Sequence, residues 1–181
     1  VSCILTLAAA GSEGSNSSVI TYKGIKGDLG SEMIRPVFSI MNPELTMTLP
    51  AYQTACGVSD IFAHIIERYF TNTKDVNLTD ELCEALMRNI LKYGKVAVEH
   101  PDDYNARAQI MWTGTLAHND ICGCDRDQDW ASHLIQHRIG AKYDSAHGAG
   151  LATIYPAWMK YVYKHDVPRF VRFATKVMGV D

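Results

Sequence analysis

Hydrophobic and polar positions follow two different patterns along the 181-residue chain, and the change lies close to Pro50. Before it, short apolar runs alternate with segments rich in glycine, serine and other small residues, which is typical of short β-strands and their connections. From Pro50 to the end, apolar residues recur at helical spacing. The pattern therefore predicts a mainly α fold, with a β-containing region at residues 1–48 and an α-helical domain at residues 49–181.

The β-containing region has three apolar runs of strand length, separated by segments rich in turn-forming residues. We expect strands at Val1–Leu7, Ser18–Tyr22 and Arg35–Met41, and a turn-rich connection at Lys23–Ser31.

The helical domain divides at prolines, glycines and polar loops into six segments. The expected helices are Leu49–Phe70, a helix that begins at Leu78, Asp102–His118, Trp130–Gly140, His147–Tyr163 and Val167–Met178. In the second of them, Thr79 is placed to cap the first turn. Its buried stripe is expected to consist of Leu82, Leu86, Ile90 and Leu91.

Composition limits the partners that the chain can have. A hydrophobic content of 47% with a net charge of −3 is typical of a globular domain and argues against binding nucleic acid or an anionic membrane surface. No apolar run approaches the about 20 residues that a helix needs to span a bilayer. The five cysteines are scattered and odd in number, which favours a reducing, cytoplasmic compartment over a disulfide framework.

The strongest chemical signal is a pair of motifs in the helical domain. Asp60 and His64 lie four residues apart, so both project from one helix face. His133 and His137 repeat this spacing, and His147 follows at the start of the next expected helix. Imidazole nitrogens bind Fe, Zn, Ni or Co, and a carboxylate adds charge that favours a divalent cation. Asp60, His64, His133 and His147 are therefore candidate ligands of one cation.

Each motif also has an ordinary structural interpretation. An aspartate and a histidine four residues apart on a helix often form a surface pair that stabilises the helix. The histidines outside the two motifs are expected to have surface or locally hydrogen-bonded roles; they are His100, His118 and His165. Taken together, the two motifs favour the metal interpretation.

A resemblance to a known family runs through most of the chain. The segments GVSDIFAHIIE, DWASHLIQHRIGAKYDSAHGAGLA and YPAWMKYV resemble the iron-dependent (group III) alcohol dehydrogenases, closest to their NADP-linked butanol dehydrogenase or aldehyde reductase branch. The segments AAAGSEGSNSSVIT and FSIMNPELTMTLP resemble the cofactor-facing loop of that family and the approach to its first helix.

By position, the resemblance implies a role for each candidate residue. The implied metal ligands are Asp60, His64, His133 and His147, and the implied cofactor contacts are Gly11, Ser12, Glu13, Lys26 and Leu45. His137 matches a catalytic histidine beside the nicotinamide and the substrate, and it is not expected to be a ligand. The implied cofactors are Fe²⁺, with Zn²⁺ as the alternative, and NADP(H) or NAD(H).

The function implied by the resemblance is hydride transfer between NAD(P)(H) and a small alcohol or aldehyde, in a homo-oligomer that we expect to be a dimer. The chain is expected to be an internal piece of a longer protein, because the family's N-terminal dinucleotide domain and C-terminal end have no counterpart here. Two alternatives stay open. One is a catalytically inactive metal-binding helical fragment or interaction module, and the other is a metal-dependent lyase on the same scaffold.

Overall fold

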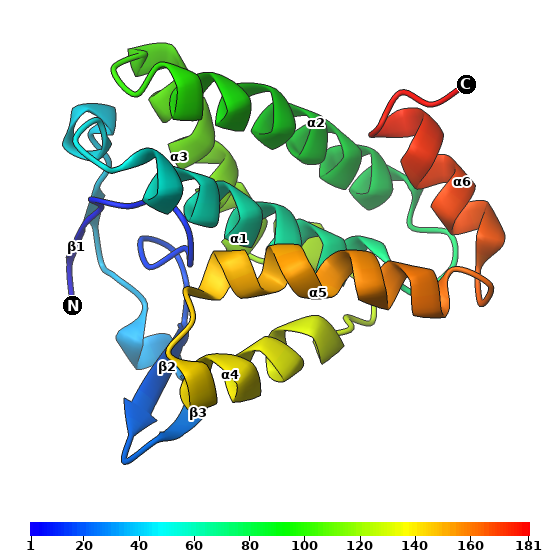
Figure 1. Cartoon of the computed structure of the whole chain (residues 1–181), viewed down its shortest axis with the longest axis horizontal. Helices are drawn as coiled ribbons and strands as arrows, with labels where there is room; N and C mark the ends of the chain where they lie inside the picture. The colour runs from blue at the N-terminus through cyan, green and yellow to red at the C-terminus, as the bar shows by residue number, and fades with distance from the viewer.

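The computed structural model describes residues 1–181 as a set of packed helices with short strands at one end (Figure 1). The helices are α1 (Ala51–Tyr69), α2 (Asn77–Glu99), α3 (Tyr104–His118), α4 (Ala131–Tyr143), α5 (His147–Val162) and α6 (Val167–Lys176). The strands are β1 (Cys3–Ile4), β2 (Ser17–Tyr22), β3 (Ile25–Gly30) and β4 (Ser39–Ile40). Three short 3-10 helices are η1 (Glu32–Ile34), η2 (Pro43–Thr46) and η3 (Ile121–Gly123). The mainly α fold expected from the sequence is confirmed.

Helix α1 is central to the packing. It lies against α2 on one side and α5 on the other, while α3 packs on α2 and α4 packs on α5 (Figure 1). Its apolar face is fully buried and joins the buried residues of α2 in one hydrophobic core; from α1 these are Ile61, Ile65, Ile66 and Tyr69. Burying each of the three isoleucine side chains stabilises the fold by about 1.5–3 kcal/mol. The core therefore fixes the position of α1, from which the candidate ligands Asp60 and His64 project.

The expected cap of α2 was wrong, and its expected buried face was right at Ile90 but wrong at Leu82 and Leu91. The helix begins at Asn77 after Val76, so Thr79 lies inside its first turn and caps nothing. Leu82 and Leu91 are 37% and 38% exposed, whereas the buried face includes Cys83, Met87, Ile90 and Gly94. The helix is rotated in this way because two acidic residues of α2, Asp80 and Glu84, are buried against arginines from later segments.

The sequence predicted a turn-rich connection at Lys23–Ser31, but most of this segment forms strand β3. Strands β2 and β3 pair in antiparallel register from Ser17 opposite Gly30 to Tyr22 opposite Ile25. Lys23 and Gly24 form the two-residue turn between them with φ angles of 48° and 75°. Turns of this kind need left-handed residues because their twist then matches the twist of the strands. The other two expected strands, Val1–Leu7 and Arg35–Met41, are shorter than predicted. Only Cys3–Ile4 and Ser39–Ile40 form strands there, and they pair in parallel.

Two glycines allow close approach to α1. A Cβ atom on Gly148 of α5 would overlap the carbonyl oxygen of Cys56, and a Cβ on Gly57 would overlap the carbonyl oxygen of Ala8. Both contacts therefore require a residue without a side chain. Gly148 directly follows His147, so this contact also sets how close His147 lies to α1.

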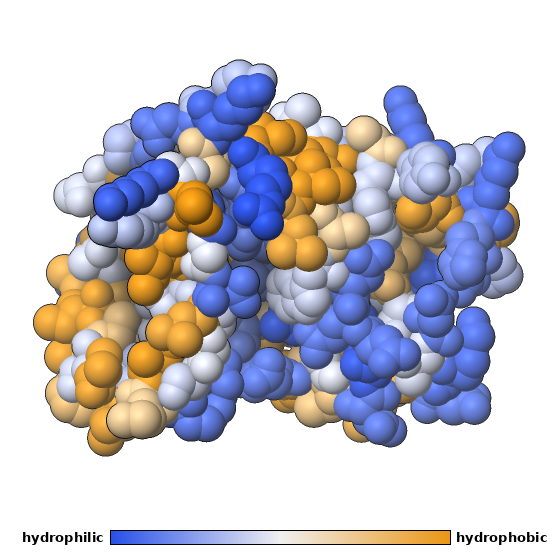
Figure 2. Space-filling model, turned by 90° about the horizontal axis from the view of Figure 1, so that it is seen from below, coloured by the Kyte–Doolittle hydropathy of each residue, from blue (hydrophilic) through white to orange (hydrophobic).

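The surface is unevenly divided between hydrophobic and hydrophilic residues. Figure 2 shows hydrophobic side chains gathered toward one end of the face seen from below, on the side where Figure 1 places the strands, and a largely hydrophilic opposite end. Exposed hydrophobic residues of the strand region include Val1, Ile4, Val37, Phe38 and Ile40. No helix in the structure combines the length and the apolar character that crossing a bilayer requires.

Candidate metal centre

Three helices bring the four candidate ligands close together, and the ligand atoms of Asp60, His133 and His147 all lie within 4.8 Å of one another. Asp60 and His64 come from α1, His133 lies in the first turn of α4, and His147 is the first residue of α5. The Oδ1 atom of Asp60 lies 3.5 Å from His64 Nε2, 3.6 Å from His133 Nε2 and 3.4 Å from His147 Nε2. The Nε2 atoms of His64 and His133 are 3.2 Å apart. The residues that the two sequence motifs singled out therefore lie together, and their role as ligands stays a prediction.

The donor set fits a divalent cation. Asp60 is only 3% exposed, and its Oδ1 atom has no hydrogen-bond partner. A buried carboxylate oxygen without a partner is unfavourable unless a cation balances its charge. Ligand bonds of about 2.0–2.2 Å place neighbouring ligand atoms about 3.0–3.6 Å apart, and the spacing around Asp60 matches this range.

Electrostatics favour the charged form of the carboxylate and act in opposite directions on His64 and His133. Burial opposes the ionisation of Asp60, but its contacts with His133 and His147 and the charge of His64 outweigh this effect, and the pKa of Asp60 is lowered. Burial lowers the pKa of His64 well below its usual range, and the neighbouring His118 lowers it further. Burial also opposes the charged form of His133, but contacts with Asp60 and Glu67 raise its pKa overall.

A cleft of about 650 Å³ opens beside this cluster, within the range of about 300–1,000 Å³ that is typical of small-molecule sites. All four candidate ligands line it, together with His137, Ser12 and Lys26 from the sequence-based set. The ring centroid of His137 lies 5.3 Å from that of His147. Burial, followed by the charges of His147 and Lys26, lowers the pKa of His137 to about 4. His137 is therefore a neutral imidazole at physiological pH.

Three other residues expected to contact the cofactor do not line the cleft. Gly11 has a φ of 65°, and a Cβ there would overlap the Cβ of His118. Glu13 is buried and accepts a hydrogen bond of 2.7 Å from Thr115 Oγ1. Leu45 lies in η2 and is exposed. Gly11 and Glu13 thus join the loop to α3, and a cofactor contact stays a prediction for all three.

Among the cleft residues that were not singled out as site residues from the sequence are Arg68, His118 and Trp130. The Arg68 guanidinium lies 4.7 Å from the centre of the Trp130 ring, which in turn meets the rings of His64 and His133 edge-on. Arg68 is four residues beyond His64 and Trp130 is three before His133, so helical spacing was the signal that could have found both.

His118 had no such signal in the sequence. Its Nδ1 atom donates a hydrogen bond of 2.7 Å to the carbonyl oxygen of Gly114, which agrees with the expected local role. The side chain is nevertheless 6% exposed rather than on the surface, and its ring centroid lies 3.9 Å from that of His64. The partner is 54 positions earlier in the chain, so only the packing of α3 on α1 brings the two rings together.

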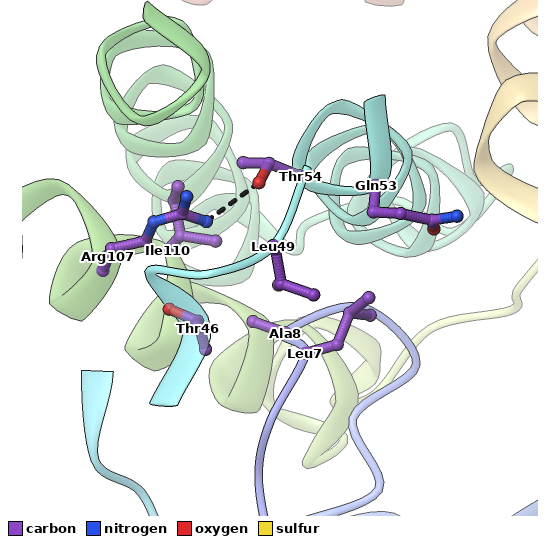
Figure 3. A pocket seen from close by; sticks show the side chains of 8 residues that line it. All are labelled: Leu7, Ala8, Thr46, Leu49, Gln53, Thr54, Arg107 and Ile110. Atoms are coloured by element: carbon purple, nitrogen blue, oxygen red, sulfur yellow. Dashed lines mark hydrogen bonds between the residues drawn. The ribbon is translucent and has the colours of Figure 1, made fainter. Parts of the chain in front are cut away.

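A second hollow, drawn in Figure 3, is lined by none of the histidines. Its volume is about 10 Å³, which is room for about one water molecule. There Arg107 of α3 donates a hydrogen bond of 2.9 Å to Thr54 Oγ1, near the start of α1. Arg107 also donates to the carbonyl oxygen of Pro101 at 2.9 Å. This hollow is therefore a structural connection and too small for a ligand.

Comparison with known proteins identifies a family and several relatives that this chain resembles. The family described as "Fe-containing alcohol dehydrogenase family, C-terminal" matches residues 54–181. NADH-dependent butanol dehydrogenase B of Clostridium acetobutylicum is 44% identical over 184 residues, which cover 100% of this chain and 47% of that protein. NADPH-dependent aldehyde reductase YqhD of Escherichia coli is 36% identical over 183 residues, 98% of this chain and 46% of its own length.

A solved structure shows the same fold. The crystal structure of NADH-dependent butanol dehydrogenase A from Thermotoga maritima matches this chain with a TM-score of 0.95 at 40% identity. The match covers 98% of this chain and 45% of that one. The chain thus spans about half the length of the curated relatives that it matches.

Proposed function

The chain belongs to the Fe-containing alcohol dehydrogenase family, and from this membership we propose that it supplies the metal-binding part of an enzyme that transfers hydride between NAD(P)(H) and a small alcohol or aldehyde. The relatives are named for butanol or for aldehydes, and for NADH or NADPH, so the proposal includes both nicotinamide cofactors. Because the chain spans about half the length of these relatives, the activity of the whole protein is part of the proposal.

One observation carries the proposal: the unpartnered, buried Oδ1 atom of Asp60 faces three imidazole nitrogens in the wall of an open cleft. In the proposal, Asp60, His64, His133 and His147 hold Fe²⁺, and Zn²⁺ suits the same donors. The bound cation would polarise the substrate oxygen and so favour hydride transfer at the carbon that carries it.

His137 has a different role in the proposal. It lies one helical turn beyond His133 and lines the cleft, but its ring is 6.3 Å from that of His133, centroid to centroid. As a neutral imidazole, it can accept a proton on one nitrogen while it releases one from the other. We therefore assign His137 the exchange of the substrate proton with solvent.

Other cleft residues would hold the cofactor and exclude water. The Lys26 ammonium and the Ser12 hydroxyl are suited to the phosphates and ribose hydroxyls of a dinucleotide. Trp130 and Leu134 give the cleft an apolar wall beside the histidines. This wall would limit the access of water to the reacting atoms.

The test combines metal content with turnover. The chain is loaded with Fe²⁺ without oxygen, its metal content is measured by plasma mass spectrometry, and the reduction of butanal is followed with NADPH and with NADH. We expect about one metal ion per chain, lost in His133→Ala but retained in His137→Ala, which should turn over more slowly. Equal metal loss in both variants contradicts the division of roles.

Two further outcomes separate the alternatives. Bound metal without turnover favours a metal-binding helical module over a working dehydrogenase half. A chain that holds no metal after loading contradicts the proposal itself.

A further inference from the structure

Two buried polar side chains lie behind the candidate ligands. Glu67 of α1 is 2% exposed and Gln136 of α4 is completely buried. The Oε1 atom of Glu67 lies 2.9 Å from His133 Nδ1, and the Oε1 atom of Gln136 contacts His147 Nδ1. An ionised carboxylate and an amide oxygen can only accept, so each imidazole, in its neutral form, donates from Nδ1 and keeps its lone pair on Nε2.

Glu67 makes a second contact to the same residue. The backbone N–H of His133 donates to Glu67 Oε1 at 3.0 Å. His133 lies in the first turn of α4, where backbone N–H groups have no partner within the helix, and Trp130 at the N-cap offers no side-chain acceptor. The carboxylate from α1 therefore acts as the missing cap and is also favoured by the helix dipole. One oxygen thus fixes both the backbone and the ring of His133.

Gln136 lies in space that two glycines leave open. A Cβ on Gly150 of α5 would lie 2.8 Å from Gln136 Cγ, and a Cβ on Gly140 would lie 3.0 Å from Gln136 Nε2. The Nε2 atom of Gln136 is buried without a hydrogen-bond partner, which is unfavourable. A methionine would fill similar space without that cost, so packing alone does not explain a glutamine at this position.

We propose that Glu67 and Gln136 are positioning residues that keep the protons of His133 and His147 on Nδ1 and turn both Nε2 lone pairs toward Asp60. This inference rests on the proposed function, because the paired Nε2 atoms serve a bound cation. The two positions act unequally. Glu67 contributes a negative charge that makes His133 a stronger donor to a cation, whereas Gln136 orients His147 without adding charge.

Metal affinity is the first measurement. Zn²⁺ binding is determined by competition with a chromophoric chelator for the wild type and for Glu67→Met, Glu67→Gln and Gln136→Met. We expect about 10- to 100-fold weaker binding for both methionine variants, with the larger loss at Glu67. Glu67→Gln should lose less than Glu67→Met, because its amide oxygen can still accept both hydrogen bonds. Gln136→Glu should bind Zn²⁺ more tightly than the wild type.

Glu84→Gln is the matched control. Glu84 is buried to the same degree and accepts a hydrogen bond of 2.9 Å from Tyr69, but it does not line the cleft. Its substitution should reduce stability and leave Zn²⁺ affinity unchanged. Equal weakening by Glu84→Gln and Glu67→Gln would mean that Glu67 acts through general stability, and the inference would be overturned.

A measurement on the metal-free protein separates this inference from the proposed function. Long-range ¹H–¹⁵N NMR spectra, recorded as the pH is raised until both imidazoles are neutral, report which ring nitrogen carries the remaining proton. We expect the Nδ1–H form for His133 and His147, and a mixture of forms for His133 in Glu67→Met and for His147 in Gln136→Met. Unchanged tautomers in these variants overturn the inference. Wild-type protein with both Nδ1–H forms that binds no Zn²⁺ contradicts the proposed function, not the positioning.

Discussion

Gly11 holds a left-handed backbone conformation directly against His118. A side chain in this conformation costs about 1–3 kcal/mol of unfolding free energy, and at Gly11 it would also displace His118. We predict that Gly11→Ala destabilises the protein clearly more than Gly24→Ala, as measured by urea denaturation. Gly24 is the matched control because its φ is 75° but nothing lies within 4 Å of an added Cβ. Equal losses would mean that the contact with His118 contributes nothing.

His118 should make stability depend on pH in the metal-free protein. Burial lowers its pKa to about 4, whereas a histidine in the unfolded chain has a pKa of about 6.5. As the pH falls between these values, the unfolded chain binds a proton that the folded chain does not, so stability falls. The full effect is about 3 kcal/mol.

The variant His118→Asn removes this titration and keeps a donor for Gly114. We predict that its unfolding free energy, measured by urea denaturation in EDTA, falls less than that of the wild type between pH 7 and pH 4.5. Carboxylates titrate in both proteins, so only the difference between the two curves counts. Parallel curves would contradict a lowered pKa for His118.

The residues of the cluster differ in how far the sequence reveals them. Asp60 with His64 was readable because two residues one helical turn apart must share a face. Glu67 and Gln136 lie behind the histidines, and their contacts depend on how α1, α4 and α5 pack, which no local pattern encodes. The candidate ligands could thus be predicted, and Glu67 could be placed near them by its spacing of three from His64, but the contacts that orient the histidines could not.

Among the helices, α6 is attached to α2 by buried charge. The carboxylate of Asp80 lies 3.0 Å from Arg126, 2.6 Å from Arg169 and 3.4 Å from Arg172. Glu84, one turn later in α2, contacts Arg172 as well. Such a cluster is stable only while every charge keeps its partner.

Substituting Asp80 should therefore strongly lower the free energy of unfolding. We predict that Asp80→Ala lowers the unfolding free energy in urea by about 3–5 kcal/mol, because it leaves buried arginines without a partner. Lys74→Ala is the comparison, since its ion pair with Asp166 spans 3.6 Å and Lys74 is 74% exposed. That change should cost less than about 1 kcal/mol. Small, similar losses in both variants would show that the cluster does not hold α6.

Helix positions were predictable, but helix faces were less so. All six helices exist where the periodicity placed them, with ends that shift by a few residues. The face of α2 was misjudged at Leu82 and Leu91, though not at Ile90, because Asp80 is buried by Arg126, Arg169 and Arg172, which follow far along the chain. Strand β3 was missed because its sequence, Ile25–Gly30, is polar and glycine-rich, and the turn at Lys23 and Gly24 determines its pairing.

For the whole molecule, the candidate metal centre joins α1, α4 and α5. A cation that binds only the folded chain would stabilise it by about 4 kcal/mol at a free concentration 1,000 times the dissociation constant. We predict that Zn²⁺ raises the Tm of the wild type, that EDTA reverses the shift, and that His133→Ala abolishes it. His165→Ala is the control, since this exposed histidine contacts Asn72 and should keep the full shift. A shift that survives in His133→Ala would place the cation elsewhere.

The docking of α5 on α1, which brings Gly148 against Cys56, also determines when the cation centre can form during synthesis. Asp60 and His147 are 87 positions apart (147 − 60), and they meet only after α5 has docked on α1. At about 5–20 residues per second, a ribosome adds His147 about 4–17 s after Asp60. Local helices form far faster than this, so α1 carries Asp60 and His64 for seconds before the last donor exists. The order of synthesis thus makes the cation centre one of the last features to be completed.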